Sequence, residues 1–314
     1  MLKLGSSENM EFLNRNCPGC GSSSDQALPA MHSTPRAEDL NFADLTSYWR
    51  GFKKKNIFFS YFRCSVCQLV YCPVYFTSEQ LLDLYSFMDD NTAGEKGSVL
   101  VKTQESYLRN LSEKIEIHGN WLELGGDIGL LTEQLLSFSS VDSVDVLEPN
   151  LNVHEQLNET LKSRGKVAAS WSGISNEKKF KGVIAIHVFD HLLDLQSELK
   201  MIIKSLEKEG SIFFVTHDES SILQKFLKSK WPPFCLQHPQ LFNPESIKNI
   251  LKLNGFNKIH ATKTFNYFTL RHIVDVATSV IGFGGFISKL CPNVTIKLKL
   301  GNIATFAQKT DLVA

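Results

Sequence analysis

The chain has 314 residues, 43% of them hydrophobic, so it is long enough to bury a substantial core. Its 33 basic and 33 acidic side chains cancel to a formal net charge of zero, which argues against nucleic acid as a partner. The first residues, MLKLGSSENMEF, lack the apolar core of a secretory signal, so we expect a cytoplasmic protein. The apolar stretch at 273–290 is interrupted by Asp275 and by glycines, and we expect no transmembrane segment.

Two C-x-x-C pairs stand near the start of the chain: CPGC, with Cys17 and Cys20, and CSVC, with Cys64 and Cys67. Each such turn brings two thiolates to one point, and two turns complete the four-thiolate shell that zinc prefers. Because four protein ligands leave no coordination position open, the predicted zinc ion is structural rather than catalytic. The alternative is two unrelated pairs of reduced thiols.

The residues around these pairs are rich in aromatic side chains, as in NIFFSYFRC and YCPVYF. A segment this small builds little core by itself, so a bound metal would help to stabilise it. We therefore predict a small zinc-binding module over 1–80 and a second domain over 81–314. A helix-prone stretch, SEQLLDLYSFM, and a glycine-containing linker join the two, and a helix is expected at 101–116.

From residue 120 short apolar strands alternate with helical patterns, which is typical of a parallel α/β sheet. Strands are expected at 120–125, 143–149, 166–171, 182–189 and 211–217. Helices are expected at 130–138, 154–165, 194–210 and 244–256. Two β-rich pieces at 258–268 and 298–309 predict a C-terminal hairpin. The apolar segment around Gly282 and Gly285 is a candidate lid, with a buried connecting helix and turn as the favoured alternative.

The stretch WLELGGDIGLL, residues 121–131, runs from an apolar strand through a glycine turn into a helix. Ligands of doubly wound sheets lie at the carboxyl ends of the strands, where glycines let the backbone approach them closely. Glu148 ends the next predicted strand, where a carboxylate can accept hydrogen bonds from the two hydroxyls of a ribose. Together the two features predict a nucleoside-binding site.

The glycines at 125, 126 and 129 do not fit the dinucleotide pattern G-x-G-x-x-G, which disfavours an NAD-dependent oxidoreductase. The stretch resembles instead the first motif of class I S-adenosylmethionine-dependent methyltransferases, E/D-x-G-x-G-x-G. The match holds at Glu123, Gly125 and Gly129, and it fails at Asp127, where that family has its middle glycine. At Asp127 we expect ordinary backbone geometry with a negative φ.

Other segments resemble the same family: DVLEPN its acidic second motif, AIHVFDHLLDL the end of its fourth strand, and NPESIKNILKLNGF the unit before its sixth. The resemblance covers about 100–314 and implies a Rossmann-like, seven-stranded methyltransferase sheet that binds S-adenosylmethionine. The cysteine module resembles the zinc-binding domain that precedes some methyltransferases of sugar and natural-product biosynthesis. The cofactor contacts implied by the resemblance are Glu123, Gly125, Gly126, Asp127, Gly129, Glu148 and His187.

Methyl transfer to oxygen or carbon requires a positioned acceptor and removal of a proton, and histidine suits that role because its pKa is near neutral. The candidate bases are His191 after the fourth strand, His217 at the end of the fifth, and His238 in the loop WPPFCLQHPQLFNP. We expect a methyltransferase for a small-molecule acceptor, such as a sugar nucleotide or a lipid-linked intermediate. The alternatives are an RNA methyltransferase and a protein that binds an adenosyl ligand without catalysis.

Overall fold

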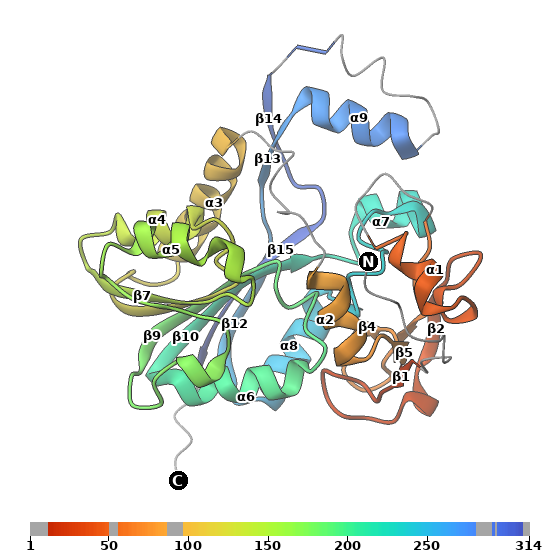
Figure 1. Ribbon diagram of the computed structural model, residues 1–314, viewed down its shortest axis with the longest axis horizontal. Helices are drawn as coiled ribbons and strands as arrows, with labels where there is room; N and C mark the ends of the chain where they lie inside the picture. The colour runs from red at the N-terminus through yellow and green to blue at the C-terminus, as the bar shows by residue number, and fades with distance from the viewer. Residues whose placement is uncertain (1–11, 50–55, 87–96, 281–290, 293, 310–314) are drawn as a thin grey trace, which may run out of the picture.

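The computed structural model describes residues 12–49, 56–86, 97–280, 291–292 and 294–309. Its largest feature is a seven-stranded sheet in the order β12-β15-β10-β9-β6-β7-β8 (Figure 1). Strands β6 to β10 run parallel, whereas β15 is antiparallel to both of its neighbours. This confirms the predicted α/β, Rossmann-like seven-stranded sheet. The strands are β6 (Gly119–Leu124), β7 (Val141–Leu147), β8 (Val167–Ala168), β9 (Phe180–Ile186), β10 (Leu206–His217), β12 (Phe256–Lys263) and β15 (Asn302–Lys309).

Helices cover both faces of this sheet, as Figure 1 shows. One core cluster joins the sheet to α3 (Gly97–Ser112), α4 (Leu130–Leu136) and α5 (His154–Leu161). The other joins it to α6 (Leu195–Ser205) and α8 (Pro244–Leu253). Because both faces are covered, the central strands are continuous apolar runs rather than alternating ones, as in the FKGVIAI sequence of β9.

Local sequence signals set the helix ends well in α8 and poorly in α6. At α8 the Asn243 side chain accepts hydrogen bonds from two backbone N–H groups, Pro244 occupies the first turn, and Gly255 follows the end with φ 77°. The helix predicted at 194–210 ends instead at Ser205. Leu206 is buried and pairs with β9, so strand pairing overrides the helical pattern that continues to Gly210.

The N-terminal part forms a small antiparallel sheet in the order β11-β4-β3-β2, at the right of Figure 1. It comprises β2 (Leu28–Met31), β3 (Tyr61–Arg63), β4 (Val70–Tyr71) and β11 (Gln240–Leu241). Beside it lie the pair β1 (Leu13–Asn14) and β5 (Val74–Tyr75), with α1 (Phe42–Thr46) and α2 (Ser78–Ser86). Trp231, Phe234 and Leu241 belong to the same aromatic core. The loop before α8 therefore completes the N-terminal core.

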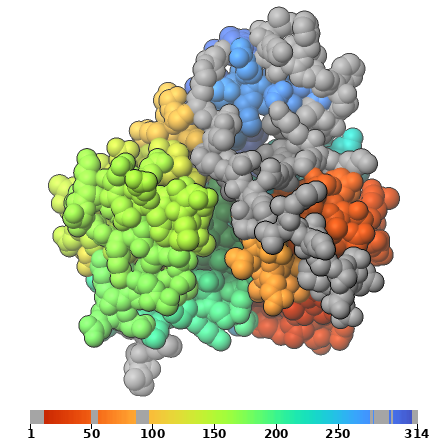
Figure 2. Space-filling model, in the orientation of Figure 1, coloured from red at the N-terminus to blue at the C-terminus, as the bar shows by residue number. Residues whose placement is uncertain are grey.

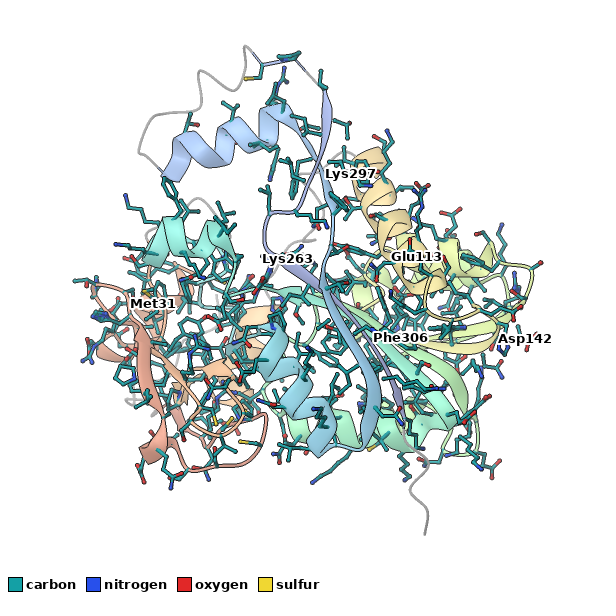
Figure 3. The ribbon with its side chains drawn as sticks, turned by 180° about the vertical axis from the view of Figure 1, so that it is seen from behind. Met31, Glu113, Asp142, Lys263, Lys297 and Phe306 are labelled. Atoms are coloured by element: carbon teal, nitrogen blue, oxygen red, sulfur yellow. The ribbon has the colours of Figure 1, made fainter. Side chains whose placement is uncertain are left out.

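A second hairpin rises from the end of β12. It pairs β13 (Asn266–Thr269) with β14 (Thr295–Leu298) and carries α9 (Leu270–Val280). Seen from behind, Lys263 marks the base of this hairpin and Lys297 its stem, while Phe306 lies within the main sheet (Figure 3). The candidate lid around Gly282 lies outside the described residues. Within the described ranges, no helix is long and apolar enough to cross a membrane.

Candidate functional site

The predicted glycine turn joins β6 to α4 at the carboxyl edge of the sheet. A Cβ atom on Gly126 would lie 2.4 Å from Val146 Cγ1, and one on Gly125 would lie 2.6 Å from Val188 Cγ2. Both contacts are far shorter than side chains tolerate, so glycine is required for β6, β7 and β9 to end so close together. The turn therefore opens a backbone surface beside the strand ends, where a ligand of this fold binds.

Asp127 adopts the backbone conformation of a glycine. Its φ is 46°, so the expectation of a negative φ is wrong. Aspartate tolerates this left-handed region better than most residues, because its short polar side chain can form local hydrogen bonds. The turn thus has a positive φ at this position although the residue is not a glycine.

The carboxylate of Glu148 is fixed against the glycine turn. Oε2 accepts a hydrogen bond from the N–H of Asp127 at 3.0 Å, and Oε1 accepts one from the N–H of Asn150 at 2.8 Å. Each carboxylate oxygen retains a further lone pair for another donor. The side chain is 8% exposed and is held by these two hydrogen bonds at the end of β7.

Glu123 has a different place from the one that a direct cofactor contact suggests. It lies beneath the turn at 2% exposure, where its Oε2 accepts a hydrogen bond from Thr132 Oγ1 at 2.5 Å. Burial raises the pKa of this carboxyl to about 8, so it is largely protonated at neutral pH. The structure therefore gives Glu123 a supporting position under the turn.

Replacing Glu123 by glutamine should stabilise the protein increasingly as the pH rises. The folded-state pKa is above the unfolded value, so the stability of the wild type is complete below the unfolded pKa and falls as the pH rises toward about 8. The Glu123→Gln variant escapes this loss, which amounts to about 3 kcal/mol at pH 7. Melting temperatures of both proteins between pH 5 and pH 8.5 would test it. The exposed Glu133, as Glu133→Gln, is the matched control, and a constant difference across the pH range would contradict the assignment.

Four histidines form one continuous group at the same edge of the sheet. The ring centroids are 4.6 Å apart between His187 and His217, 5.1 Å between His217 and His238, and 4.6 Å between His238 and His191. They come from the ends of β9 and β10 and from the loop before β11. The structure thus brings together all three predicted bases and the histidine predicted to contact the cofactor. Val188, which touches the glycine turn, follows His187 directly.

The polar partners of this histidine group include residues that sequence reasoning missed. The Asn302 side chain lies between two of the rings, with Oδ1 3.1 Å from His217 Nδ1 and Nδ2 3.3 Å from His187 Nε2. Asn302 begins the last strand, and only the antiparallel register of β10 and β15 sets it opposite His217. Tyr85 of α2 is a second such partner, with its hydroxyl 3.3 Å from His191 Nδ1.

Burial keeps these imidazoles neutral. It lowers the pKa of His187 to about 4 and that of His217 to about 3, and it lowers the pKa values of His191 and His238 as well. At neutral pH the four rings are therefore uncharged, and their lowered pKa values make them weaker bases than a free histidine. His238 is oriented by the carbonyl of Pro233, 2.8 Å from Nδ1. Since a carbonyl only accepts hydrogen bonds, Nδ1 carries the proton and Nε2 keeps a free lone pair.

The four cysteines of the two C-x-x-C pairs converge as predicted. Their sulfur atoms lie within 4.8 Å of one another, at 3.5 Å between Cys17 and Cys67 and 3.6 Å between Cys20 and Cys64. Zn–S bonds of 2.3 Å in a tetrahedron separate sulfurs by about 3.8 Å, so the spacing fits a zinc ion. The contact between Cys17 and Cys67 lowers the pKa of the Cys17 thiol and raises that of Cys67, so without a metal these two sulfurs share one proton.

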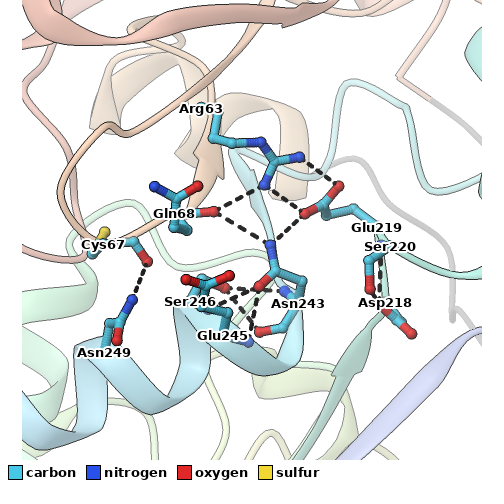
Figure 4. A network of polar contacts seen from close by, with 10 residues as sticks. All are labelled: Arg63, Cys67, Gln68, Asp218, Glu219, Ser220, Asn243, Glu245, Ser246 and Asn249. Carbon is cyan, nitrogen blue, oxygen red and sulfur yellow. Dashed lines mark hydrogen bonds and ion pairs between the residues drawn. The ribbon is translucent and has the colours of Figure 1, made fainter.

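A polar network connects the second cysteine turn to the loop after His217 (Figure 4). Arg63 pairs with both carboxylate oxygens of Glu219, at 2.9 and 3.0 Å, and also donates to the carbonyl of Gln68 at 3.1 Å. Asn243 donates to Glu219 at 2.5 Å. Gln68 directly follows Cys67, so these contacts connect the cysteine cluster to the loop after His217.

Figure 2 shows the surface hollowed between the green residues around α5 and the orange α2.

Residues 102–261 match a family described as "Methyltransferase domain", over about half of the chain. The matched segment includes the glycine turn, Glu148 and the four clustered histidines. The chain belongs to this family of methyltransferases.

The chain is also similar in fold to solved methyltransferases. One is the N-methyltransferase NodS from Bradyrhizobium japonicum WM9 with S-adenosyl-l-homocysteine, at 13% identity and a TM-score of 0.46, covering 74% of this chain and 98% of that one. Another, from Thermotoga maritima and described as a possible histamine N-methyltransferase, has 14% identity and a TM-score of 0.46, covering 67% and 91%. The plantazolicin methyltransferase BpumL has 12% identity and a TM-score of 0.47, covering 74% and 92%. No protein with a curated description matches the sequence.

Proposed function

We propose that the protein methylates an oxygen or carbon of a small-molecule acceptor, with a histidine at the edge of the sheet as general base. The observation that carries this proposal is the packing of the glycine turn against Val188, directly after His187. That contact places the glycine turn, where we propose the nucleoside of the cofactor binds, beside the four neutral histidines. When bound, S-adenosylmethionine supplies a methyl group on a positively charged sulfur, and the protein must orient the acceptor and remove its proton.

The cofactor would lie along the turn. Its backbone contacts come from Gly125, Gly126, Asp127 and Gly129, and Glu148 accepts hydrogen bonds from the ribose hydroxyls. His187 borders the methyl-donor end. Glu123 acts from beneath, by holding the start of α4 through Thr132.

Among the predicted bases His191, His217 and His238, we propose His238 as the residue that takes the proton. Its Nε2 lone pair is free because Nδ1 donates to Pro233, and its ring touches those of His191 and His217. The backbone around it is held by the N-terminal part, since the Tyr61 hydroxyl donates to the carbonyl of His238 at 2.6 Å. Because both its ring and its backbone are held by hydrogen bonds, His238 can take the proton without first changing its own position.

The N-terminal segment, 1–80, we propose as a zinc-binding module that shapes the acceptor site of the methyltransferase domain, 81–314. Cys17, Cys20, Cys64 and Cys67 would hold a structural zinc ion. The acceptor class we propose, a sugar nucleotide or a related biosynthetic intermediate in the cytoplasm, rests on the resemblance of this module to those of sugar and natural-product methyltransferases. A lipid-linked form of such an acceptor is the second candidate.

Incubation with S-adenosylmethionine and a panel of sugar nucleotides should yield S-adenosylhomocysteine and a methylated product. Replacing His238 by alanine should lower the turnover by about 100-fold or more, the usual contribution of a general base, with unchanged cofactor binding. Product mass spectrometry checks the first result and single-turnover rates the second. His260→Ala, an exposed histidine on β12, is the matched control. Methylation of RNA by the wild type, or full activity of His238→Ala, would contradict this proposal.

A further inference from the structure

A second group of metal-binding side chains lies at the carboxyl edge of the sheet, apart from the four cysteines. One nitrogen each of His187 and His217 and one carboxylate oxygen of Asp190 lie within 4.8 Å of one another. We infer that these three side chains bind a divalent transition-metal ion.

The strongest indication is the state of Asp190. This side chain is completely buried, and its Oδ1 atom has no hydrogen-bond partner in the described part of the chain. Oδ2 accepts a hydrogen bond from the N–H of His217 at 3.2 Å and lies 3.9 Å from His187 Nδ1, which also lacks a hydrogen-bond partner among the described residues. A buried carboxylate needs a cation or a proton, because its own charge is very unfavourable in an apolar surrounding. An ion between Asp190 and His187 would satisfy both of these atoms.

Asn302 holds the ring of His217 in place for such an ion. Its Oδ1 accepts the Nδ1–H of His217 at 3.1 Å, so Nε2 of that ring is left to ligate. Nδ2 of the same amide faces His187 Nε2, so His187 ligates through Nδ1 once its proton leaves that nitrogen and this contact is given up. Histidines that bind metals usually have their second nitrogen hydrogen-bonded in this way, which makes Asn302 a positioning residue for the site.

The three donor side chains indicate which metal ions the site can bind and what the bound ion does. Two imidazoles and one carboxylate suit zinc, iron, cobalt or manganese, and three protein ligands leave coordination positions open. The ring of His238 lies next to that of His217, with 5.1 Å between the ring centroids, so the proposed base is a neighbour of the proposed ligand set. The role, which rests on the proposed function, is to bind a hydroxyl oxygen of the acceptor. The O–H proton then passes to His238, the oxygen bonds to the methyl carbon, and the carbon–sulfur bond breaks to release S-adenosylhomocysteine. The acceptor is accordingly a hydroxyl-bearing molecule.

Titration of cobalt(II) into protein that carries one equivalent of zinc, enough to fill the four-cysteine site, tests the second site without reference to activity. We expect one further equivalent of cobalt to bind by calorimetry without release of zinc, and without the sulfur-to-cobalt charge-transfer absorption that cysteine ligands produce. Asp190→Asn, a change that preserves shape, and His217→Ala should weaken cobalt binding by more than about 100-fold. Asn302→Leu should weaken it by about 10- to 100-fold, the usual effect of losing a partner behind a ligand. His191→Ala is the matched control, since its ring lies in the same group but outside the ligand set.

The outcomes separate this inference from the proposed function. If no further cobalt binds to the wild type, or if Asp190→Asn and His217→Ala bind it as well as the wild type does, the metal site is wrong. S-adenosylmethionine binding, measured on the same proteins by thermal shift, shows whether each variant is folded and whether the cofactor site stands. Cobalt binding with methyl transfer to carbon but to no hydroxyl acceptor would overturn the role given to the ion, and cobalt binding with no methyl transfer to oxygen or carbon would overturn the proposed function; both leave the metal site intact.

Discussion

Replacing Cys64 by serine should release the zinc ion and lower the melting temperature of the whole protein by about 10 °C or more. Cys64 is 1% exposed and its sulfur faces that of Cys20, so a zinc shell cannot re-form around a hydroxyl there without strain. Structural zinc sites contribute their binding free energy directly to folding, about 10–16 kcal/mol in isolated finger peptides. Zinc content by elemental analysis and unfolding by circular dichroism would measure both effects.

The buried Cys72 provides the matched control. It is 1% exposed and lies close in sequence, but its sulfur faces the carbonyl of Phe59 at 3.7 Å and it is outside the cysteine cluster. The Cys72→Ser variant should keep its zinc and lose far less stability. If Cys64→Ser unfolds at the wild-type temperature, the cysteine cluster does not stabilise the fold through a metal.

The Cys64→Ser variant should lower the rate of methyl transfer more than it lowers the affinity for the cofactor. Loss of the second cysteine turn would move the Gln68 carbonyl, which anchors Arg63 and through it Glu219. Glu219 lies two residues after His217, in the loop that follows β10. The glycine turn and Glu148 belong to the other half of the sheet and do not share this network. The zinc module is therefore expected to act on the acceptor site.

The sequence predicts the main sheet well because its signals are local. Apolar strands and the glycine turn each act over a few residues, and the structure contains both at nearly the expected places. Each C-x-x-C turn is likewise a local unit, whereas the meeting of the two turns at one point requires long-range folding.

What the sequence does not predict depends on contacts between distant segments. Asn302 reaches His217 through the register of an antiparallel strand from the end of the chain, and nothing in LGNIATF marks it as part of a site. The aromatic core of the N-terminal part is completed by Trp231 and Phe234, which local patterns assign to another domain. Asp127 adopts a positive φ because the ends of β6, β7 and β9 fix the turn, and its own preference is overridden.

Replacing Glu148 by alanine should raise the dissociation constant for S-adenosylmethionine by about 100- to 10,000-fold. Two hydrogen bonds from ribose hydroxyls to a carboxylate are worth about 1.5–3 kcal/mol each, and both would be lost. The variant also leaves the N–H groups of Asp127 and Asn150 without their acceptors, which loosens the turn itself. Thermal unfolding with and without ligand measures the effect, because a ligand at about 100 times its dissociation constant adds about 2.7 kcal/mol to the wild type.

The Glu148→Gln variant should bind S-adenosylmethionine almost as weakly as Glu148→Ala. Comparing the two variants distinguishes a requirement for the carboxylate from a requirement for a side chain of that size. Both oxygens of Glu148 accept backbone N–H groups, and an amide offers one acceptor oxygen and an N–H₂ group that would oppose the second donor. Glu159→Ala, an exposed change on α5, should keep the full ligand-induced shift. A shift retained by Glu148→Gln but lost in Glu148→Ala would mean that a neutral acceptor suffices. A shift retained by both would place the ribose elsewhere, and the glycine turn would then have to bind the cofactor without its acidic partner.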